Sequence, residues 1–195
     1  MGAAMRYSQK DEQDYILRAV EGIITGTFLD IGAYNGEDYS DTMCLVERGW
    51  SGIMVEPGLE AFQALLARHG RANNLKLVHA AVGDGRWSPF WNNPRTFSTT
   101  LDSNRERFIN EGFGPKYWVP TVTIEDLVLF CGTSPIDVLS IDTEGTSVDI
   151  FAAYRNLPKV VCVEHDGRVD ECRSIGLMRG YSVVMQNEEN IIFVR

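Results

Sequence analysis

Short apolar runs alternate with segments of helical periodicity along most of the chain. The apolar runs predict strands at 28–31, 52–56, 75–82, 136–142 and 159–164. The segments between and around them predict helices at 8–22, 38–48, 57–69, 123–130 and 169–178, with a further helix ending near Tyr154. Two final strands, 181–186 and 191–194, flank a polar turn and read as a hairpin. This order is typical of an α/β fold with a mostly parallel sheet, helices on both faces and a C-terminal antiparallel hairpin.

One segment, 83–120, departs from this alternation. It holds turn residues, the aromatic residues Trp87, Phe90, Trp91 and Phe97, and the polar run 98–100. Insertions of this length in a compact domain usually form a functional lid or a surface for a partner. The alternative is a decorated edge with one short hairpin and a helix near 102–110. Its aromatic side chains could stack on a sugar ring, line a nucleobase pocket or bury against a second subunit, as in a homodimer.

Composition limits what else the chain can contain. Its 195 residues, 44% of them hydrophobic, predict one domain spanning 1–195. A net charge of -9 and a pI near 4.8 argue against binding to extended nucleic acid. We find no membrane-spanning stretch or lipidation signal and expect no membrane association. Four cysteines without Cys-x-x-Cys spacing fit a reducing cytoplasm.

The first predicted strand runs into a glycine turn, Asp30-Ile31-Gly32-Ala33-Tyr34-Asn35-Gly36. Glycines in such a turn let the backbone approach a ligand closely, and the amides that open the next helix can bind an anionic group. Asp30 is unusual at this position, because a carboxylate there repels a pyrophosphate but attracts an ammonium or a sulfonium. The turn therefore favours S-adenosylmethionine over NAD as the ligand.

A second acid, Glu56, ends the next predicted strand. A carboxylate at this tip can accept hydrogen bonds from both ribose hydroxyls, a geometry that dinucleotide folds and adenosyl-cofactor folds share. The dinucleotide fingerprint needs Gly-x-Gly-x-x-Gly, whereas here Ala33 stands between two glycines that are four residues apart. An NAD-dependent oxidoreductase is thus an alternative that the glycine pattern disfavours. An ordinary strand-to-helix turn without a ligand is the other.

Four motifs in this order resemble those of the FkbM-type class I S-adenosylmethionine-dependent methyltransferases. They are the glycine turn at 30–36, Val55-Glu56-Pro57, Ala80-Ala81-Val82-Gly83-Asp84 and Ile141-Asp142-Thr143-Glu144-Gly145. The resemblance covers nearly the whole chain. It implies a Rossmann-like, seven-stranded sheet whose last strand is antiparallel, and methyl transfer, most often to an oxygen of a sugar or natural product. Ser140 departs from the family pattern, because many members have a lysine before the Ile-Asp pair.

The resemblance and the residue chemistry together assign cofactor contacts. We expect the glycine turn to hold the methionine part, Asp30 to bind its ammonium and Glu56 to bind the ribose. The third strand tip would read the adenine edge, with Asp84 either there or simply a turn residue. The complete predicted cofactor set is Asp30, Gly32, Ala33, Tyr34, Asn35, Gly36, Glu56, Pro57, Ala81, Val82, Asp84 and Asp142.

Methyl transfer to an alcohol needs a base as the hydroxyl proton is lost. His165 follows the fifth predicted strand and is the expected base or acceptor-orienting group; Asp142 and Glu144 compete for that role. The alternative is that His165 only caps the next turn. A Mg²⁺ or Mn²⁺ ion held by Asp142, Glu144, His165 and Asp166 is a further hypothesis, but no compact ligand motif supports it, and we assign no metal ligand.

The sequence therefore predicts an S-adenosylmethionine-dependent O-methyltransferase acting on a glycan or another small hydroxylated acceptor. The alternatives are the NAD-dependent oxidoreductase and a scaffold that keeps the cofactor fold without turnover.

Overall fold

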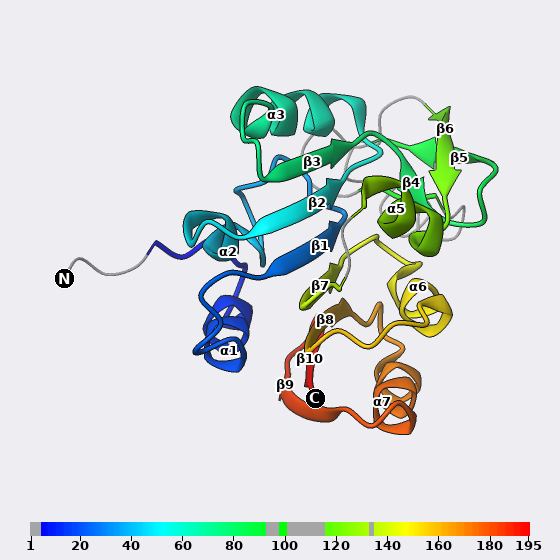
Figure 1. Cartoon of the computed structure of the whole chain (residues 1–195). Coiled ribbons are helices and arrows are strands. Elements are labelled where there is room, and N and C mark those ends of the chain that lie inside the picture. The colour runs from blue at the N-terminus through cyan, green and yellow to red at the C-terminus, as the bar shows by residue number, and fades with distance from the viewer. Residues whose placement is uncertain (1–4, 93–97, 101–115, 133–134) are drawn as a thin grey trace.

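A computed structural model describes residues 5–92, 98–100, 116–132 and 135–195 of the chain (Figure 1). Its helices are α1 (Glu12–Ala19), α2 (Met43–Glu47), α3 (Leu59–His69), α5 (Ile124–Cys131), α6 (Ser147–Ala153) and α7 (Val169–Met178). Its longer strands are β1 (Thr27–Ile31), β2 (Ser51–Val55), β5 (Trp87–Trp91), β6 (Lys116–Val122), β8 (Val160–Glu164), β9 (Ser182–Gln186) and β10 (Asn190–Val194). The shorter strands are β3 (Leu75–Val78), β4 (Ala81–Val82) and β7 (Val138–Ile141).

Seven strands form one sheet in the order β3-β2-β1-β7-β8-β10-β9. The pairs of β1 with β2, β2 with β3, β1 with β7, and β7 with β8 are parallel. β10 is antiparallel to both of its neighbours, β8 and β9. This arrangement confirms the predicted fold class, including the reversed last strand.

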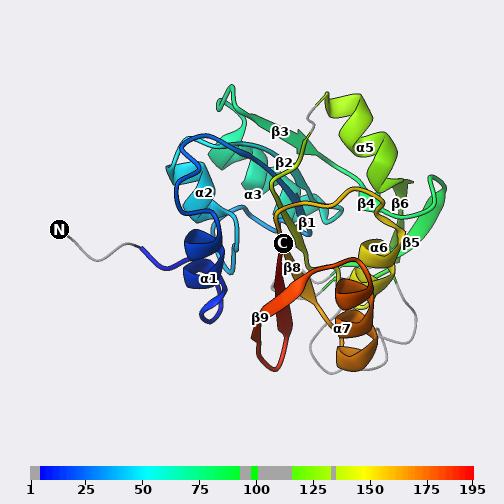
Figure 2. The same cartoon turned by 60° about the horizontal axis from the view of Figure 1, so that its bottom comes forward.

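Helices cover both faces of this sheet. One apolar cluster includes Ile16 of α1, Leu45 of α2 and Leu65 of α3, whereas the other includes Leu127 of α5 and Phe151 of α6. Neighbouring residues of a strand go to opposite clusters because side chains alternate across a sheet. Figures 1 and 2 show α1 and α2 on one side of the central strands and α6 and α7 on the other. Burial on both faces explains why the central strands read as unbroken apolar runs.

Two predicted helices are shorter than expected because side chains bind the backbone ahead of them. α1 begins at Glu12 rather than at residue 8, since the Ser8 hydroxyl accepts the amide of Gln13 across a turn. α2 begins at Met43 rather than at residue 38. Before it, the Ser40 hydroxyl accepts the amide of Met43, and Tyr39 has a left-handed φ of 61°. Such local bonds compete with helix formation.

The predicted third strand, 75–82, is wrong as a single element. β3 pairs with β2 as far as Val78, and β4 then joins a separate sheet of order β4-β6-β5. The ladder with β2 ends because Glu56 is followed by Pro57, which has no amide hydrogen to donate. The Pro57 carbonyl instead lies 3.1 Å from Nε2 of His79. The break therefore comes from the partner strand, not from the run of apolar residues itself.

The described part of the insertion builds the small sheet, which lies beyond the arrowheads of β2 and β3 (Figure 1). β5 and β6 are antiparallel, with Phe90 opposite Tyr117 and Ser88 opposite Val119. Phe90 and Val119 are buried and pack with Ala81 of β4. The predicted helix near 102–110 lies outside the described residues. The insertion thus extends the fold next to the carboxyl ends of the main sheet.

Gly52 gives a test of this packing. A methyl group there would lie 2.2 Å from Cζ of Phe28, on the adjacent strand β1. We expect Gly52→Ala to lower the free energy of unfolding by about 1–3 kcal/mol, the usual cost of overpacking a core. Urea denaturation measures this loss. The neighbouring Ser51→Ala is the control, because Ser51 is exposed and its substitution should change stability by less than about 0.5 kcal/mol. Equal stability of the two variants would contradict the packing described.

Candidate functional site

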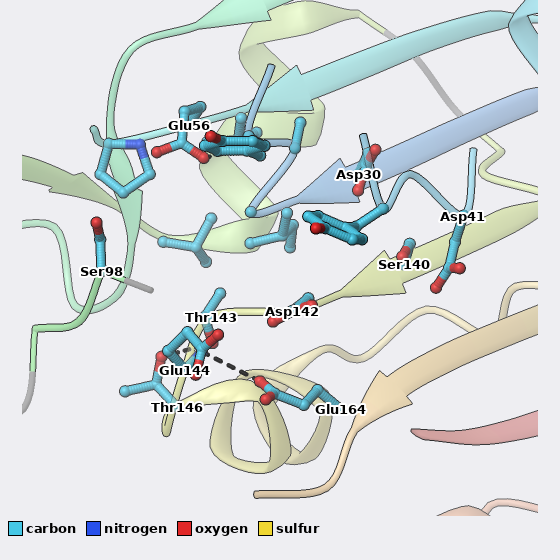
Figure 3. Close-up of a pocket in the computed structure, with 18 of the residues that line it drawn as sticks. Asp30, Asp41, Glu56, Ser98, Ser140, Asp142, Thr143, Glu144, Thr146 and Glu164 are labelled. Atoms are coloured by element: carbon cyan, nitrogen blue, oxygen red, sulfur yellow. Dashed lines mark hydrogen bonds between the residues drawn. The ribbon is translucent and has the colours of Figure 1, made fainter. Parts of the chain in front are cut away.

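A pocket of about 370 Å³ opens at the carboxyl ends of β1, β2, β7 and β8 (Figure 3). β1 and β7 are neighbours in the sheet, but the chain leaves them toward opposite edges, through β2 and β3 on one side and β8 on the other. Ligands of open α/β sheets bind at this kind of switch point. The sheet order therefore places the pocket where the first sequence motif predicted it.

Gly32 lets the turn after β1 approach the end of β7. Its φ is +88°, and a methyl group on it would lie 1.6 Å from the carbonyl oxygen of Asp142. The amides of Gly32 and Ala33 both donate to the Val55 carbonyl, at 2.9 and 3.0 Å. Gly32, Ala33 and Tyr34 line the pocket. Only glycine fits at position 32, because its hydrogen faces rigid backbone.

The second half of the glycine turn has a different role. Asn35 Oδ1 accepts the amides of Glu37 and Asp38, at 3.0 and 2.9 Å, and the Gly36 carbonyl lies 3.1 Å from Nε2 of His69. Asn35 and Gly36 are not among the pocket-lining residues. The amides that were expected to meet an anion are therefore satisfied within the turn, and the predicted helix start at residue 38 is absent. Asn35 and Gly36 therefore stabilise the turn without lining the pocket.

Asp30 is buried at the end of β1 and faces the pocket. Its Oδ2 accepts a hydrogen bond of 2.6 Å from the Thr42 hydroxyl. Burial raises the pKa of Asp30 to about 7, the negative charge of Asp142 adds to the rise, and the Thr42 bond partly offsets it. The carboxylate is thus short of positive charge, and a ligand cation would stabilise its ionised form.

Glu56 joins the tip of β2 to the glycine turn. Its two oxygens accept the amides of Tyr34 at 2.9 Å and Gly58 at 2.6 Å. Burial raises the pKa of Glu56 to about 7 in spite of these two bonds. Each oxygen keeps a second lone pair, so the fixed carboxylate can still accept hydroxyl groups from the pocket. Tyr34, which has a left-handed φ of 49°, is held in place by the same contact.

An apolar end of the pocket lies beside Glu56. It is lined by Pro57, Ala61, Ala81, Val82 and Phe90. Asp84 lies outside the lining: its side chain is 67% exposed and pairs with Arg86. Its Oδ1 also accepts the Arg86 amide at 3.1 Å. Ala81 and Val82 therefore lie in the pocket lining, whereas Asp84 is the turn residue of the alternative interpretation.

Three carboxylates meet where β7 and β8 end. Single oxygens of Asp142, Glu144 and Glu164 lie within 4.8 Å of one another. Glu144 has a left-handed φ of 53°, and its amide donates to Oε2 of Glu164 at 3.1 Å, drawn as a dashed line in Figure 3. Burial raises the pKa of Asp142 to about 6, and burial together with the neighbouring carboxylates raises the pKa of Glu164. We call Asp142, Glu144 and Glu164 the acid turn.

His165 also lines the pocket, but backbone groups hold its ring. Nδ1 accepts the Gly167 amide at 3.1 Å, and Nε2 lies 3.3 Å from the Asn187 carbonyl, to which it can donate when protonated. To accept a proton from an acceptor, His165 would have to give up one of these contacts. His165 therefore caps the turn, as in the alternative interpretation of the sequence. The carboxylates are more open than His165 to a methyl acceptor.

The pocket is strongly acidic. The lining that the structure describes contains no lysine or arginine, and its acidic residues are Asp30, Asp38, Asp41, Glu56, Asp142, Glu144, Glu164, Asp166, Glu188 and Glu189. Lys10 pairs with Glu188 at the rim. Ser140, which stands where a lysine is common in the family that the motifs resemble, is buried in the lining. The substitution leaves this part of the pocket without a cation.

The sequence interpretation missed five acidic residues of the lining: Asp38, Asp41, Glu164, Glu188 and Glu189. Asp41 fell within a predicted helix, and nothing in its local pattern marks it; its Oδ2 accepts the Cys162 thiol at 3.2 Å across the pocket floor. Glu164 was assigned only as the end of a strand. Its position next to the strand that ends at Asp142 was the available signal, because adjacent parallel strands bring their carboxyl ends together.

Comparison with known families identifies the chain. The family model described as the methyltransferase FkbM domain matches residues 30–182, which include the glycine turn, Glu56 and the acid turn. The chain belongs to the FkbM methyltransferase family. This membership confirms the resemblance seen in the motifs, and it makes the protein a methyltransferase with S-adenosylmethionine as its cofactor.

Solved structures agree with the fold of this FkbM methyltransferase. It is similar to a precorrin-8w decarboxylase of Methanobacterium thermoautotrophicum, with 14% identity, a TM-score of 0.54 and coverage of 98% of this chain and 92% of that chain. A putative caffeoyl-CoA O-methyltransferase of Staphylococcus aureus has 14% identity, a TM-score of 0.53 and coverage of 97% and 86%. Identities this low show the fold alone. No curated protein matches the sequence.

The residues of the pocket fit S-adenosylmethionine. The cofactor carries an ammonium and a sulfonium, and Asp30 and Asp142 are carboxylates whose pKa values are raised chiefly by desolvation. Glu56 is fixed for the ribose hydroxyls, and the apolar end beside it suits an adenine ring. Of the predicted cofactor set, Asn35, Gly36 and Asp84 are not in the lining. The carboxylates of the pocket thus complement the positive charges of the cofactor that the family uses.

The raised pKa values predict how stability depends on pH. Asp30 and Glu56 titrate near pH 7 in the folded chain but near pH 4 when unfolded, so the folded state binds more protons between these values. We expect the melting temperature of the ligand-free protein to fall as the pH rises from 5 to 7.5. Differential scanning calorimetry measures this slope. Asp30→Asn should flatten it, because the amide cannot ionise, and an unchanged slope in that variant would contradict the assignment.

Proposed function

We propose that this methyltransferase transfers the methyl group to a hydroxyl oxygen of a sugar or another small, uncharged acceptor. The observation that carries the proposal is the acid turn beside an otherwise acidic pocket. A hydroxyl acceptor must lose a proton, and a carboxylate of the acid turn can accept it. Bound S-adenosylmethionine supplies the electrophilic methyl group.

The charge of the pocket supports the choice of acceptor class. The described lining has ten acidic residues and neither lysine nor arginine. A phosphorylated or otherwise anionic acceptor would be repelled, and the same repulsion argues against an NAD pyrophosphate. Uncharged hydroxyl groups can instead donate hydrogen bonds to the carboxylates.

We also propose a cytoplasmic location. The buried thiols of Cys44, Cys162 and Cys172 are not in disulfides, as a reducing compartment would maintain them. Within the described residues, no helix is both long enough and apolar enough to cross a bilayer.

The first experiment is calorimetric titration of the protein with S-adenosylhomocysteine, with NADH as the control. We expect micromolar binding of the adenosyl ligand and none of NADH. Transfer of labelled methyl from S-adenosylmethionine to a panel of neutral sugars, each compared with its phosphate ester, then tests the acceptor class. Binding of NADH alone, or labelling of the phosphate esters only, would overturn the proposal. Parallel assays with magnesium and with EDTA test the metal hypothesis.

A second prediction concerns the base. We propose that Glu144, which lies in the acid turn, accepts the hydroxyl proton, rather than His165. Glu144→Gln should lower kcat by about 10²-fold or more, the usual contribution of a general base. Affinity for S-adenosylhomocysteine should stay within about twofold, because the change preserves shape. His165→Gln should lower kcat less than Glu144→Gln does. The measurement is kcat as a function of pH for the two variants. A larger loss of kcat in His165→Gln than in Glu144→Gln would restore the histidine as the base.

A further inference from the structure

Thr99 connects the insertion to the acid turn. Its hydroxyl donates a hydrogen bond of 2.8 Å to the carbonyl oxygen of Glu144. The residue is 1% exposed although it belongs to a short described piece, 98–100, of a long connection. Ser98 and Thr100, its neighbours on either side, line the pocket, and Figure 3 shows Ser98 reaching it from the insertion. The buried Thr99 side chain therefore links the insertion to the acid turn by a specific hydrogen bond.

The backbone of Thr99 is fixed as well. Its amide and carbonyl exchange hydrogen bonds with the carbonyl and amide of Trp91, at 3.2 and 2.9 Å, in an antiparallel bridge. Trp91 is the last residue of β5 and is itself buried. β5 pairs with β6, which pairs with β4, and β4 lines the apolar end of the pocket. A hydrogen-bonded path therefore runs from the apolar end, across the small sheet, to Glu144.

Glu144 needs such support because of its conformation. A left-handed φ of 53° is costly for a residue with a side chain, by about 1 kcal/mol or more, and it persists only where neighbours hold it. Two bonds do so on opposite sides of the residue: Glu164 accepts its amide, and Thr99 donates to its carbonyl. The first bond comes from the main sheet and the second from the insertion.

We infer that Thr99 is a positioning residue, which aims the Glu144 carboxylate at the place where the acceptor hydroxyl meets the methyl group, through its hydrogen bond to the Glu144 carbonyl. The inference rests on the proposed function, since it gives the insertion a part in methyl transfer. Thr99 acts on the acceptor side of the pocket and not on cofactor affinity, because its bond goes to the acid turn. The insertion thereby completes the site.

Sinefungin gives a test that needs no acceptor. This analogue of S-adenosylmethionine carries an amine where the cofactor has its methyl-bearing sulfonium, so its cation reports whether a carboxylate faces that position. S-adenosylhomocysteine has a neutral thioether at that position and so lacks this positive charge. In Thr99→Val we expect the preference for sinefungin over S-adenosylhomocysteine to fall about tenfold, the effect of one lost hydrogen bond, while S-adenosylhomocysteine affinity changes by less than about twofold. Calorimetry measures both affinities.

Two variants separate positioning from a general loss of structure. Thr99→Ser keeps the hydroxyl and should restore most of the preference. Thr121→Val is the matched control, because the Thr121 hydroxyl bonds within the same small sheet, to the Arg86 carbonyl, and lies outside the pocket lining. It should leave both affinities unchanged.

The outcomes distinguish the two proposals. A wild-type protein that binds neither ligand would overturn the proposed function. Normal binding with an unchanged preference in Thr99→Val, or an equal loss of both affinities there and in Thr99→Ser, would overturn the role of Thr99 and leave the proposed function standing.

Discussion

Carboxylates gather at one end of the sheet without enough positive charge to balance them, and the rest of the site depends on this constraint. Parallel strands bring their carboxyl ends together, so acids that follow β1, β2, β7 and β8 in the sequence meet around one pocket. Each would ionise easily if it were alone in water. Asp30 and Glu56 are buried, and in the pocket Asp30, Glu56 and Asp142 hold their protons to unusually high pH. A ligand that carries positive charge relieves this repulsion, as a sulfonium cofactor does.

Backbone amides and hydroxyl groups keep the acids in place when no cation is near. Glu56 accepts two amides and so ties the tip of β2 to the glycine turn. Asp30 accepts the Thr42 hydroxyl, and Glu164 accepts the amide of Glu144. Hydrogen bonds from neutral donors fix geometry without cancelling charge. The pocket therefore stays both ordered and electrostatically unsatisfied, which is the state that favours a cation over a neutral analogue of the same shape.

The sequence predicts this arrangement as far as its signals are local. Apolar runs, glycine turns and terminal acids gave the sheet, its reversed last strand and the positions of Asp30, Glu56 and Asp142. Contacts between distant segments have no such signal. The split of 75–82 depends on Pro57, just after the partner strand, and the bond from the Cys162 thiol to Asp41 joins residues 121 positions apart. The capping of His165 by the Asn187 carbonyl is equally non-local. A pattern shows where a side chain falls along an element but not what meets it.

The insertion explains why the two ends of the pocket differ in what they can select. Around Glu56, the hydrogen bonds come from the amides of Tyr34 and Gly58, and Phe90 is the only insertion residue in the apolar lining described above, so little of this end depends on the insertion. Around Glu144, Thr99 supplies one of the two hydrogen bonds described above, and Ser98 and Thr100 line the pocket, all three within the insertion. Loops tolerate change better than sheets do. Changes in the insertion can therefore alter the acceptor side of the pocket while the cofactor end stays fixed.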